Sequence, residues 1–251
     1  MRRSTALVPI AAAFAALILG CAPRAHGESQ KQSGPIEIER CQTIDQPGSY
    51  RLVKNLRASG DCLVIKAQAV TLDLGGFAIT GDGTGTAIKG EKAQPGTIPQ
   101  ARTVVRNGDI SQFALATNLS GTVEGLRVTS NGKGIFVPVG IVRGNNVQFN
   151  GSAGIEIADG IVIDNLVVAN GTGIIVEEAA VITRNEVSGN KVGMDLTGTG
   201  NTLISNVVDG NSEIGLRVGC PSNLTQNTAI GNGTNLVLNG TCCRNDDNVI
   251  P

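Results

Sequence analysis

An internal repeat of about twenty residues restricts the possible folds of this chain more than any other feature of its sequence. A glycine precedes each short apolar burst, and these glycines recur at Gly134, Gly154, Gly173, Gly193 and Gly215. One asparagine column has the same period: Asn131, Asn150, Asn170, Asn190, Asn211 and Asn232. A second column runs through Asn145, Asn165, Asn185, Asn206 and Asn227. Columns that stay in step over several cycles indicate a stacked repeat architecture.

Each repeat predicts short β-strands. Bursts such as GIEI, GIIV, GMDL and GLRV alternate with period two, and no stretch keeps an apolar stripe with helical spacing. One unit has room for three short strands joined by tight turns, but it has no core of its own. The units must therefore stack, and each strand pairs in parallel with the equivalent strand one coil later. The sequence predicts an all-β parallel solenoid.

The residue types fit this architecture. Glycine allows the positive φ or the close backbone approach that corners need. Stacked asparagines can each donate an amide hydrogen to one neighbour and accept from the other. Val, Ile and Leu would fill a narrow interior, and the chain has few large side chains to fit there, since aromatics make up 2% of it and Trp is absent.

The N-terminus predicts export. A charged start, Met1 to Arg3, precedes the apolar run 6–19, which is short for a membrane span and typical of a signal peptide. Two processing sites remain open. LILGC, which ends at Cys21, is similar to a bacterial lipobox in which Cys21 would be acylated, and AHG at 25–27 is an ordinary cleavage pattern.

We favour the lipobox, which gives a signal peptide at 1–20 and a flexible tether at 21–35. Ala22 follows the cysteine, so we expect a lipoprotein of the outer membrane, anchored to the membrane through its lipid. With ordinary cleavage the protein would be periplasmic or secreted. Both alternatives place it outside the cytoplasm.

The sequence resembles the right-handed parallel β-helix repeat proteins of the pectate-lyase-like superfamily. The repeats at 67–240 carry this resemblance, and the stretch from CQTIDQPGSYRLVKNL to LDLGGFAIT (41–80) is similar to the cap and first coils of exported bacterial members. The resemblance implies a single-stranded right-handed parallel β-helix of about eight coils. Residues 36–66 would form the N-terminal cap and first coil, and 241–251 a C-terminal cap or tail.

Spacing also suggests disulfides. Residues one coil apart stack about 4.8 Å apart, within the Cα range that a disulfide requires. We expect Cys41 to pair with Cys62 at the first coil and Cys220 with Cys242 at the last. Cys243 competes for the second partner, and buried free thiols are the alternative for both pairs.

One outward column of the solenoid contains the candidate site. The column is expected to read Phe136, Glu156, Ile175, Asp195, Arg217 and Val237. Enzymes of the family that the chain resembles act on the outer face of this strand. The resemblance therefore makes Glu156, Glu177 and Asp195 candidate ligands for calcium, which would neutralise a uronate. Arg217 would be the catalytic base or would bind a substrate carboxylate.

Simpler interpretations stay open for these residues. Asp195 beside Arg217 is also the pattern of an ordinary cross-strand ion pair. Phe136 is a candidate platform for a sugar ring, or it packs against the solenoid.

Composition excludes several classes of function. The net charge is -1 and the Lys and Arg residues are scattered, which argues against a nucleic-acid partner. The only histidine is His26, before the repeats, so histidine-based metal sites and a Ser–His pair are excluded from the solenoid. We interpret the chain as a non-catalytic surface or periplasmic scaffold, or a protein that binds an acidic polysaccharide or a cell-envelope component. The alternative is a calcium-dependent uronate lyase.

Overall fold

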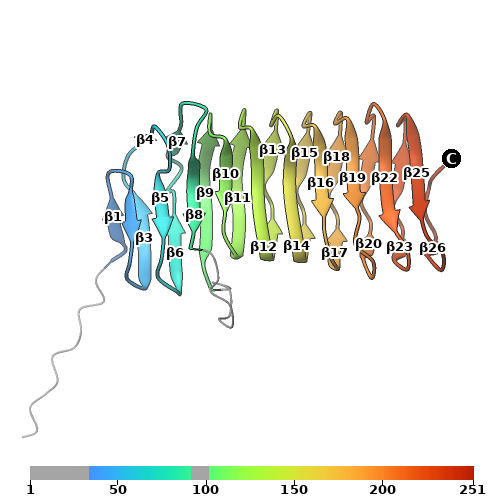
Figure 1. Ribbon diagram of the computed structural model, residues 1–251, viewed down its shortest axis with the longest axis horizontal. Helices are drawn as coiled ribbons and strands as arrows, with labels where there is room; N and C mark the ends of the chain where they lie inside the picture. Colours follow the sequence, from blue (N-terminus) through green and yellow to red (C-terminus); the bar gives the residue numbers. More distant parts are fainter. Residues whose placement is uncertain (1–33, 92–101) are drawn as a thin grey trace, which may run out of the picture. The chain divides into compact units, whose positions relative to one another are not determined.

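The computed structural model describes residues 34–91 and 102–251, and within them it is built from β-strands alone (Figure 1). The expected signal peptide, most of the tether and Cys21 lie outside the described residues. All strand pairs are parallel, and each joins equivalent strands of successive coils. The chain forms a right-handed parallel β-helix of about 10 coils, which confirms the predicted fold. No helix in the described part of the chain is long and apolar enough to cross a membrane.

Three sheets form the sides of the solenoid, and we call them faces A, B and C. Face A consists of β2 (Gln42–Ile44), β5 (Leu63–Ile65), β8 (Thr86–Gly90), β10 (Leu115–Asn118), the first parts of β12 (Lys133–Arg143) and β14 (Ala153–Ile163), β16 (Thr172–Val176), β19 (Val192–Leu196), β22 (Ile214–Gly219) and β25 (Thr234–Asn239).

Face B follows face A in each coil. It consists of β1 (Ile36–Ile38), β3 (Gly48–Leu52), β6 (Val70–Asp73), the first parts of β9 (Val104–Ser111) and β11 (Gly121–Thr129), the last parts of β12 and β14, β17 (Ala180–Thr183), β20 (Thr202–Ile204), β23 (Asn223–Thr225) and β26 (Arg244–Asp246).

Face C completes the coil. It consists of β4 (Leu56–Arg57), β7 (Ala78–Thr80), the last parts of β9 and β11, β13 (Asn146–Gln148), β15 (Leu166–Val168), β18 (Glu186–Ser188), β21 (Val207–Asp209) and β24 (Thr228–Ile230).

The coil count exceeds the expected eight because both ends continue the ladders. At the N-terminal end β2 pairs with β5, and β5 pairs with β8, although residues 36–66 lack the asparagine and glycine columns. At the C-terminal end β26 pairs with β23 inside the predicted tail. Parallel pairing thus extends beyond the part of the sequence where the repeat is visible.

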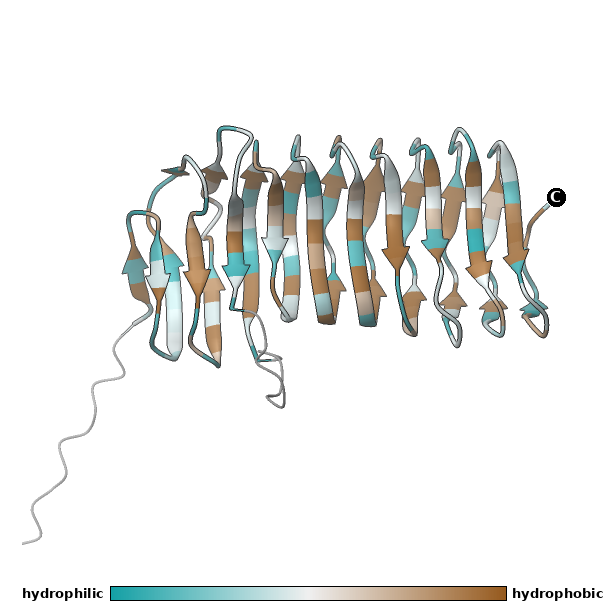
Figure 2. Ribbon diagram, viewed as in Figure 1, coloured by the Kyte–Doolittle hydropathy of each residue, from teal (hydrophilic) through white to brown (hydrophobic). Residues whose placement is uncertain are grey.

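The core is a continuous column of aliphatic side chains along the solenoid axis. Apolar and polar residues alternate along the strands (Figure 2). On face A, Ile155 and Ile157 of one coil stack on Ile174 and Val176 of the next, and all four are fully buried. Because a strand alternates between its two sides, the residue between each inward pair faces outward. The core therefore fixes which face-A side chains reach solvent.

The glycine column reflects close packing between coils. A Cβ atom at Gly173 or Gly193 would lie 2.5 Å from the carbonyl oxygen of the glycine one coil later. The left-handed backbone conformation instead occurs at the residue before each asparagine of the two columns. These positions are often occupied by residues other than glycine, such as Ala169 (φ 56°) and Arg184 (φ 52°). The glycines are therefore required by the spacing of the coils, and the left-handed corners tolerate other residues.

Two asparagine ladders join the coils at the corners. In the ladder between faces B and C, Asn165 Nδ2 donates to Asn185 Oδ1 over 2.9 Å, and Asn185 Nδ2 donates to Asn206 Oδ1 over 3.0 Å. The backbone N–H of Asn165 donates to the same Asn185 oxygen. These side chains are almost completely buried. The predicted stacking of asparagine amides is present.

Disulfides join coils near both ends, and one pairing differs from expectation. Cys41 is joined to Cys62, as predicted, with a Cα–Cα distance of 4.5 Å. Cys220 is joined to Cys243, with a Cα–Cα distance of 5.0 Å, and the expected pairing with Cys242 is wrong. Cys242 has a left-handed backbone (φ 65°) and an exposed thiol, whereas Cys243 packs against the core. The left-handed residue turns its side chain outward and leaves the next one to face Cys220.

Candidate functional site

The outward column of face A runs in register along the whole face, and its part from β10 to β25 spans seven coils. Each residue pairs in register with the next, so their side chains project from the same side at intervals of one coil. This part of the column consists of Asn118, Phe136, Glu156, Ile175, Asp195, Arg217 and Val237. The sequence predicted the last six of these positions and their order.

Phe136 and Glu156 share a partner that the sequence did not reveal. Lys133 Nζ lies 2.7 Å from Glu156 Oε2 and 5.6 Å from the centroid of the Phe136 ring. Glu156 is 8% exposed, so the lysine neutralises a largely buried carboxylate. The ring adds a cation–π contact. Lys133 occupies the position before Gly134 of the glycine column, and nothing in the repeat pattern indicates that this position is functional.

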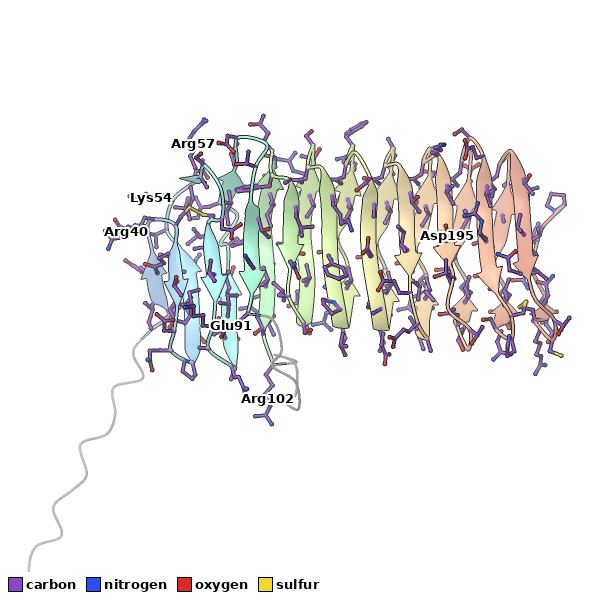
Figure 3. All side chains as sticks on the ribbon, viewed as in Figure 1. Arg40, Lys54, Arg57, Glu91, Arg102 and Asp195 are labelled. Atoms are coloured by element: carbon purple, nitrogen blue, oxygen red, sulfur yellow. A yellow bond between two sulfur atoms is a disulfide. The ribbon has the colours of Figure 1, made fainter. Side chains whose placement is uncertain are left out.

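Asp195 and Arg217 form the second charged pair of the column. Arg217 Nη1 donates to Asp195 Oδ2 over 2.7 Å, and the two side chains are 33% and 20% exposed for Arg217 and Asp195. Asp195 projects from β19 on face A (Figure 3). Its second oxygen, Oδ1, is buried and has no hydrogen-bond partner among the described residues. The pair matches the cross-strand ion pair that the sequence left open.

Glu177 lies apart from this column. It follows β16 on an exposed corner, and Ile175 occupies the register position between Glu156 and Asp195. No group of three or more His, Cys, Asp or Glu side chains in residues 34–91 and 102–251 is arranged to hold a metal ion. Calcium takes six to eight oxygen ligands, whereas Glu156 and Asp195 are each bound by a cationic side chain. In the described residues, Glu156, Glu177 and Asp195 are therefore not gathered into one calcium site.

Face A therefore offers recognition groups without a free acid–base pair. The described residues contain no histidine, because His26 is the only one in the chain. Arg217, the candidate base, is bound to Asp195. What remains accessible is a row of two neutralised ion pairs, one aromatic ring, and the half-buried aliphatic side chains Ile175 and Val237. Such a row can contact an extended ligand that runs along the solenoid axis.

Solved structures show the same fold. The chain is similar to the A-module of the mannuronan C-5 epimerase AlgE4 of Azotobacter vinelandii, with a TM-score of 0.56 and 11% identity over 81% of this chain and 87% of that one. It is also similar to the enzymatically active domain of tailspike protein 2 of bacteriophage CBA120, with a TM-score of 0.50 and 17% identity over 76% of this chain and 36% of that one. No protein-family model and no curated protein matches the sequence. The chain is a right-handed parallel β-helix protein, and at these identities the likeness concerns the fold alone.

Proposed function

We propose that this protein is an exported, non-catalytic β-helix that binds an acidic polysaccharide along face A. The main support is the unbroken register of the outward column, which places side chains about 4.8 Å apart in a line along the axis. A polymer of sugars repeats along its length on a similar scale. Lys133 and Arg217 stay about one-third exposed, so their remaining N–H donors can meet the carboxylates of a uronate chain.

The comparisons support a polysaccharide as the class of ligand. One structural neighbour is named a mannuronan C-5 epimerase, so a β-helix of this shape acts on such a polymer in that protein. Each charged side chain of the column is already held in an ion pair. This supports binding without catalysis, because a general base must be free to accept a proton.

Location outside the cytoplasm is supported by the two disulfides, since such bonds persist in oxidising compartments. We include acylation of Cys21 and attachment to the outer membrane in the proposal. Labelling with palmitate should mark the wild type and not Cys21→Ala. Equal absence of label in both would indicate cleavage after Gly27 and a periplasmic or secreted protein.

Binding is tested by affinity electrophoresis in gels containing polymannuronate or polygalacturonate. We expect Phe136→Leu and Arg217→Ala each to weaken retardation by about tenfold, the loss of one contact of about 1.4 kcal/mol. Phe149→Leu is the matched aromatic control, because Phe149 is 61% exposed at the corner between faces C and A, outside the outward column. Arg184→Ala is the matched ion-pair control, because Arg184 binds Asp164 at another corner. Wild-type protein that migrates freely in both gels would refute the proposal.

A calcium-dependent uronate lyase is the second candidate. One observation favours it: Asp195 Oδ1 is buried without a donor, and a cation would satisfy it. The enzyme would release unsaturated uronates that absorb ultraviolet light. The absorbance would then rise when the protein is mixed with polyuronate and calcium, and Arg217→Ala would abolish the rise. That result would favour the lyase over the binding proposal.

A further inference from the structure

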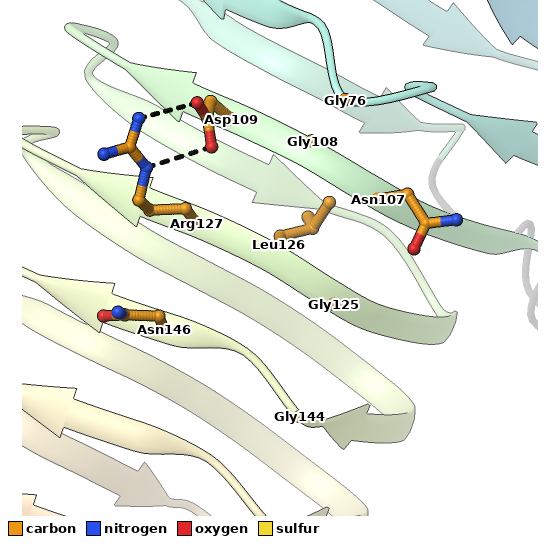
Figure 4. Close-up of a pocket in the computed structure, with 9 residues that line it drawn as sticks. All are labelled: Gly76, Asn107, Gly108, Asp109, Gly125, Leu126, Arg127, Gly144 and Asn146. Carbon is orange, nitrogen blue, oxygen red and sulfur yellow. Dashed lines mark hydrogen bonds and ion pairs between the residues drawn. The ribbon is translucent and has the colours of Figure 1, made fainter.

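A groove of about 460 Å³ lies at the corner between faces B and C, away from the outward column of face A (Figure 4). Backbone and side chains of β9, β11 and β13 line it. The lining residues that matter here are Asn107, Asp109, Gly125, Arg127, Gly144 and Asn146. None of them belongs to the candidate site above.

The groove exists because the corner lacks side chains in these coils. The corner residue of each coil is left-handed, and here it is Gly125 (φ 59°) and then Gly144 (φ 61°). In later coils Asp164, Arg184 and Ser205 adopt the same φ with side chains present. A Cβ atom at Gly144 would meet nothing within 4 Å. The hollow is therefore open space that a side chain fills elsewhere along the same corner.

A polar wall borders this hollow. Arg127 donates to both carboxylate oxygens of Asp109, over 3.0 and 2.7 Å, and in Figure 4 the pair lies to one side of Gly125 and Gly144, which we call the glycine floor. Asn146 is the register partner of Arg127 in the next coil. Because Asp109 neutralises Arg127, the wall has little net charge. Arginine has five N–H donors, so three remain for a ligand.

Asn146 leaves an acceptor without a donor. Its Oδ1 atom is buried and has no hydrogen-bond partner among the described residues. Buried polar atoms in proteins almost always have a partner. In the ladder corners, the other asparagines meet this requirement through their neighbours one coil away. Asn146 lines the groove, so a small rotation of its side chain would let a ligand there supply the missing donor.

We propose that this groove binds one residue of a neutral sugar. The site needs a donor for Asn146 Oδ1 and an acceptor for the free N–H groups of Arg127, and a sugar hydroxyl supplies both. The ion pair of Arg127 with Asp109 places N–H donors next to carboxylate oxygens, and sugar hydroxyls can donate to the oxygens and accept from the N–H groups. The open space at Gly144 leaves room for the C–H face of a ring. This site is independent of the proposed polyuronate binding on face A.

The test fills the groove without straining the backbone. Gly144→Asn adds a side chain at a φ that Asn tolerates, and Asn146→Leu removes the polar contact while leaving the floor unchanged. Ser205→Asn is the control, because it adds the same side chain at the same kind of corner (φ 55°) outside the groove. The probes are gels containing dextran, galactomannan or hydroxyethylcellulose, and circular dichroism checks that each variant is folded.

We expect at least one of these neutral polymers to retard the wild type. Gly144→Asn and Asn146→Leu should each lose tenfold or more of that affinity, and Ser205→Asn should match the wild type. Free migration of the wild type in all three gels would overturn the proposal, and so would unchanged binding by a folded Asn146→Leu. Arg217→Ala should affect polyuronate gels only, so a failure of the face-A proposal is recognised separately.

Discussion

Arg217 and Asp195 occupy the same register position in adjacent coils, and Arg217 Nη1 lies 2.7 Å from Asp195 Oδ2 while Asp195 Oδ1 is buried without a partner. The pair therefore neutralises the aspartate but satisfies only one of its two oxygens. A carboxylate in this state depends on its single cationic partner, because little water reaches it.

This dependence predicts a measurable coupling between the two residues. In a double-mutant cycle of Asp195→Asn and Arg217→Met, followed by urea unfolding, we expect a coupling free energy of about 1 kcal/mol, at the upper end for exposed pairs because both side chains are mostly buried. The same cycle on Asp164 and Arg184, which are 52% and 56% exposed, should give less. Equal coupling in the two cycles would show that burial of the face-A pair is immaterial.

Calcium should leave the stability of the protein unchanged. Glu156 and Asp195 are bound by Lys133 and Arg217, and Ile175 separates them in the column. A ligand that binds only the folded state would raise the melting temperature further with each increase in its concentration. We expect the melting temperature to stay constant across a calcium titration into the millimolar range. A rise that Asp195→Ala abolishes would restore the metal site that the sequence suggested.

The fold was predictable because the repeat carries redundant information. The glycines, both asparagine columns and the period-two bursts each require coils of the same length, and strand register follows from that length. The outward column from Phe136 to Val237 is correct for this reason. At the ends the prediction was less complete. The sequence indicated a cap with one coil at 36–66 and a cap or tail at 241–251, but not how far the strand ladders continue there, since backbone pairing needs no particular side chain.

The details of the site were less predictable because they depend on local backbone and side-chain direction. Lys133 reaches both Phe136 and Glu156 from a position that holds Ala, Thr, Val or Ile in the other repeats. The choice of Cys243 over Cys242 depends on one left-handed residue. The groove at Gly144 results from missing side chains, and a single glycine in a glycine-rich chain gives no signal. The repeat therefore predicts the β-helix, whereas the candidate sites arise where individual residues depart from the repeat.

Asn185→Ala should destabilise the solenoid by about 3 kcal/mol, because it leaves several buried groups without partners. Asn185 Oδ1 accepts from the backbone and side chain of Asn165, and its Nδ2 donates to Asn206 Oδ1 and Val162 O. Asn248→Ala, at the half-buried end of the same ladder, should cost about 1 kcal/mol, since water can replace its bonds. Urea unfolding measures both. Equal losses would show that burial does not set the strength of the ladder.

The cysteine pairing gives a direct chemical test. Peptide mapping without reduction should recover Cys220 linked to Cys243 and a free Cys242. Cys242→Ser should keep that disulfide and the stability of the wild type. Cys243→Ser should lose about 3 kcal/mol, the typical contribution for a loop of this length. Loss of the disulfide in Cys242→Ser would show that the sequence-based pairing was right.

The coils near the N-terminal end should be sensitive to acid because of Asp82. Hydrogen bonds from the Thr84 side chain (2.6 Å), from Ser59 (2.7 Å) and from the Thr84 backbone lower the pKa of this exposed carboxyl from 3.8 to about 2. The pKas of Asp61 and Asp73 are also lowered: burial opposes the shift, but hydrogen bonds to each carboxylate outweigh it.

A folded-state pKa below the unfolded value means that the ionised carboxylate stabilises the fold. This stabilisation is fully present above about pH 4 and is lost as the pH falls through about 2, because the unfolded chain takes up its proton first. In thermal melts followed by circular dichroism, Asp82→Asn should melt below the wild type at pH 7, and the difference should shrink between pH 4 and pH 2. Thr84→Val, which removes one donor and keeps the carboxyl, should show a smaller deficit with the same pH dependence. A deficit of Asp82→Asn that is constant from pH 7 to pH 2 would show that the hydrogen bonds of Asp82 do not favour its charged form.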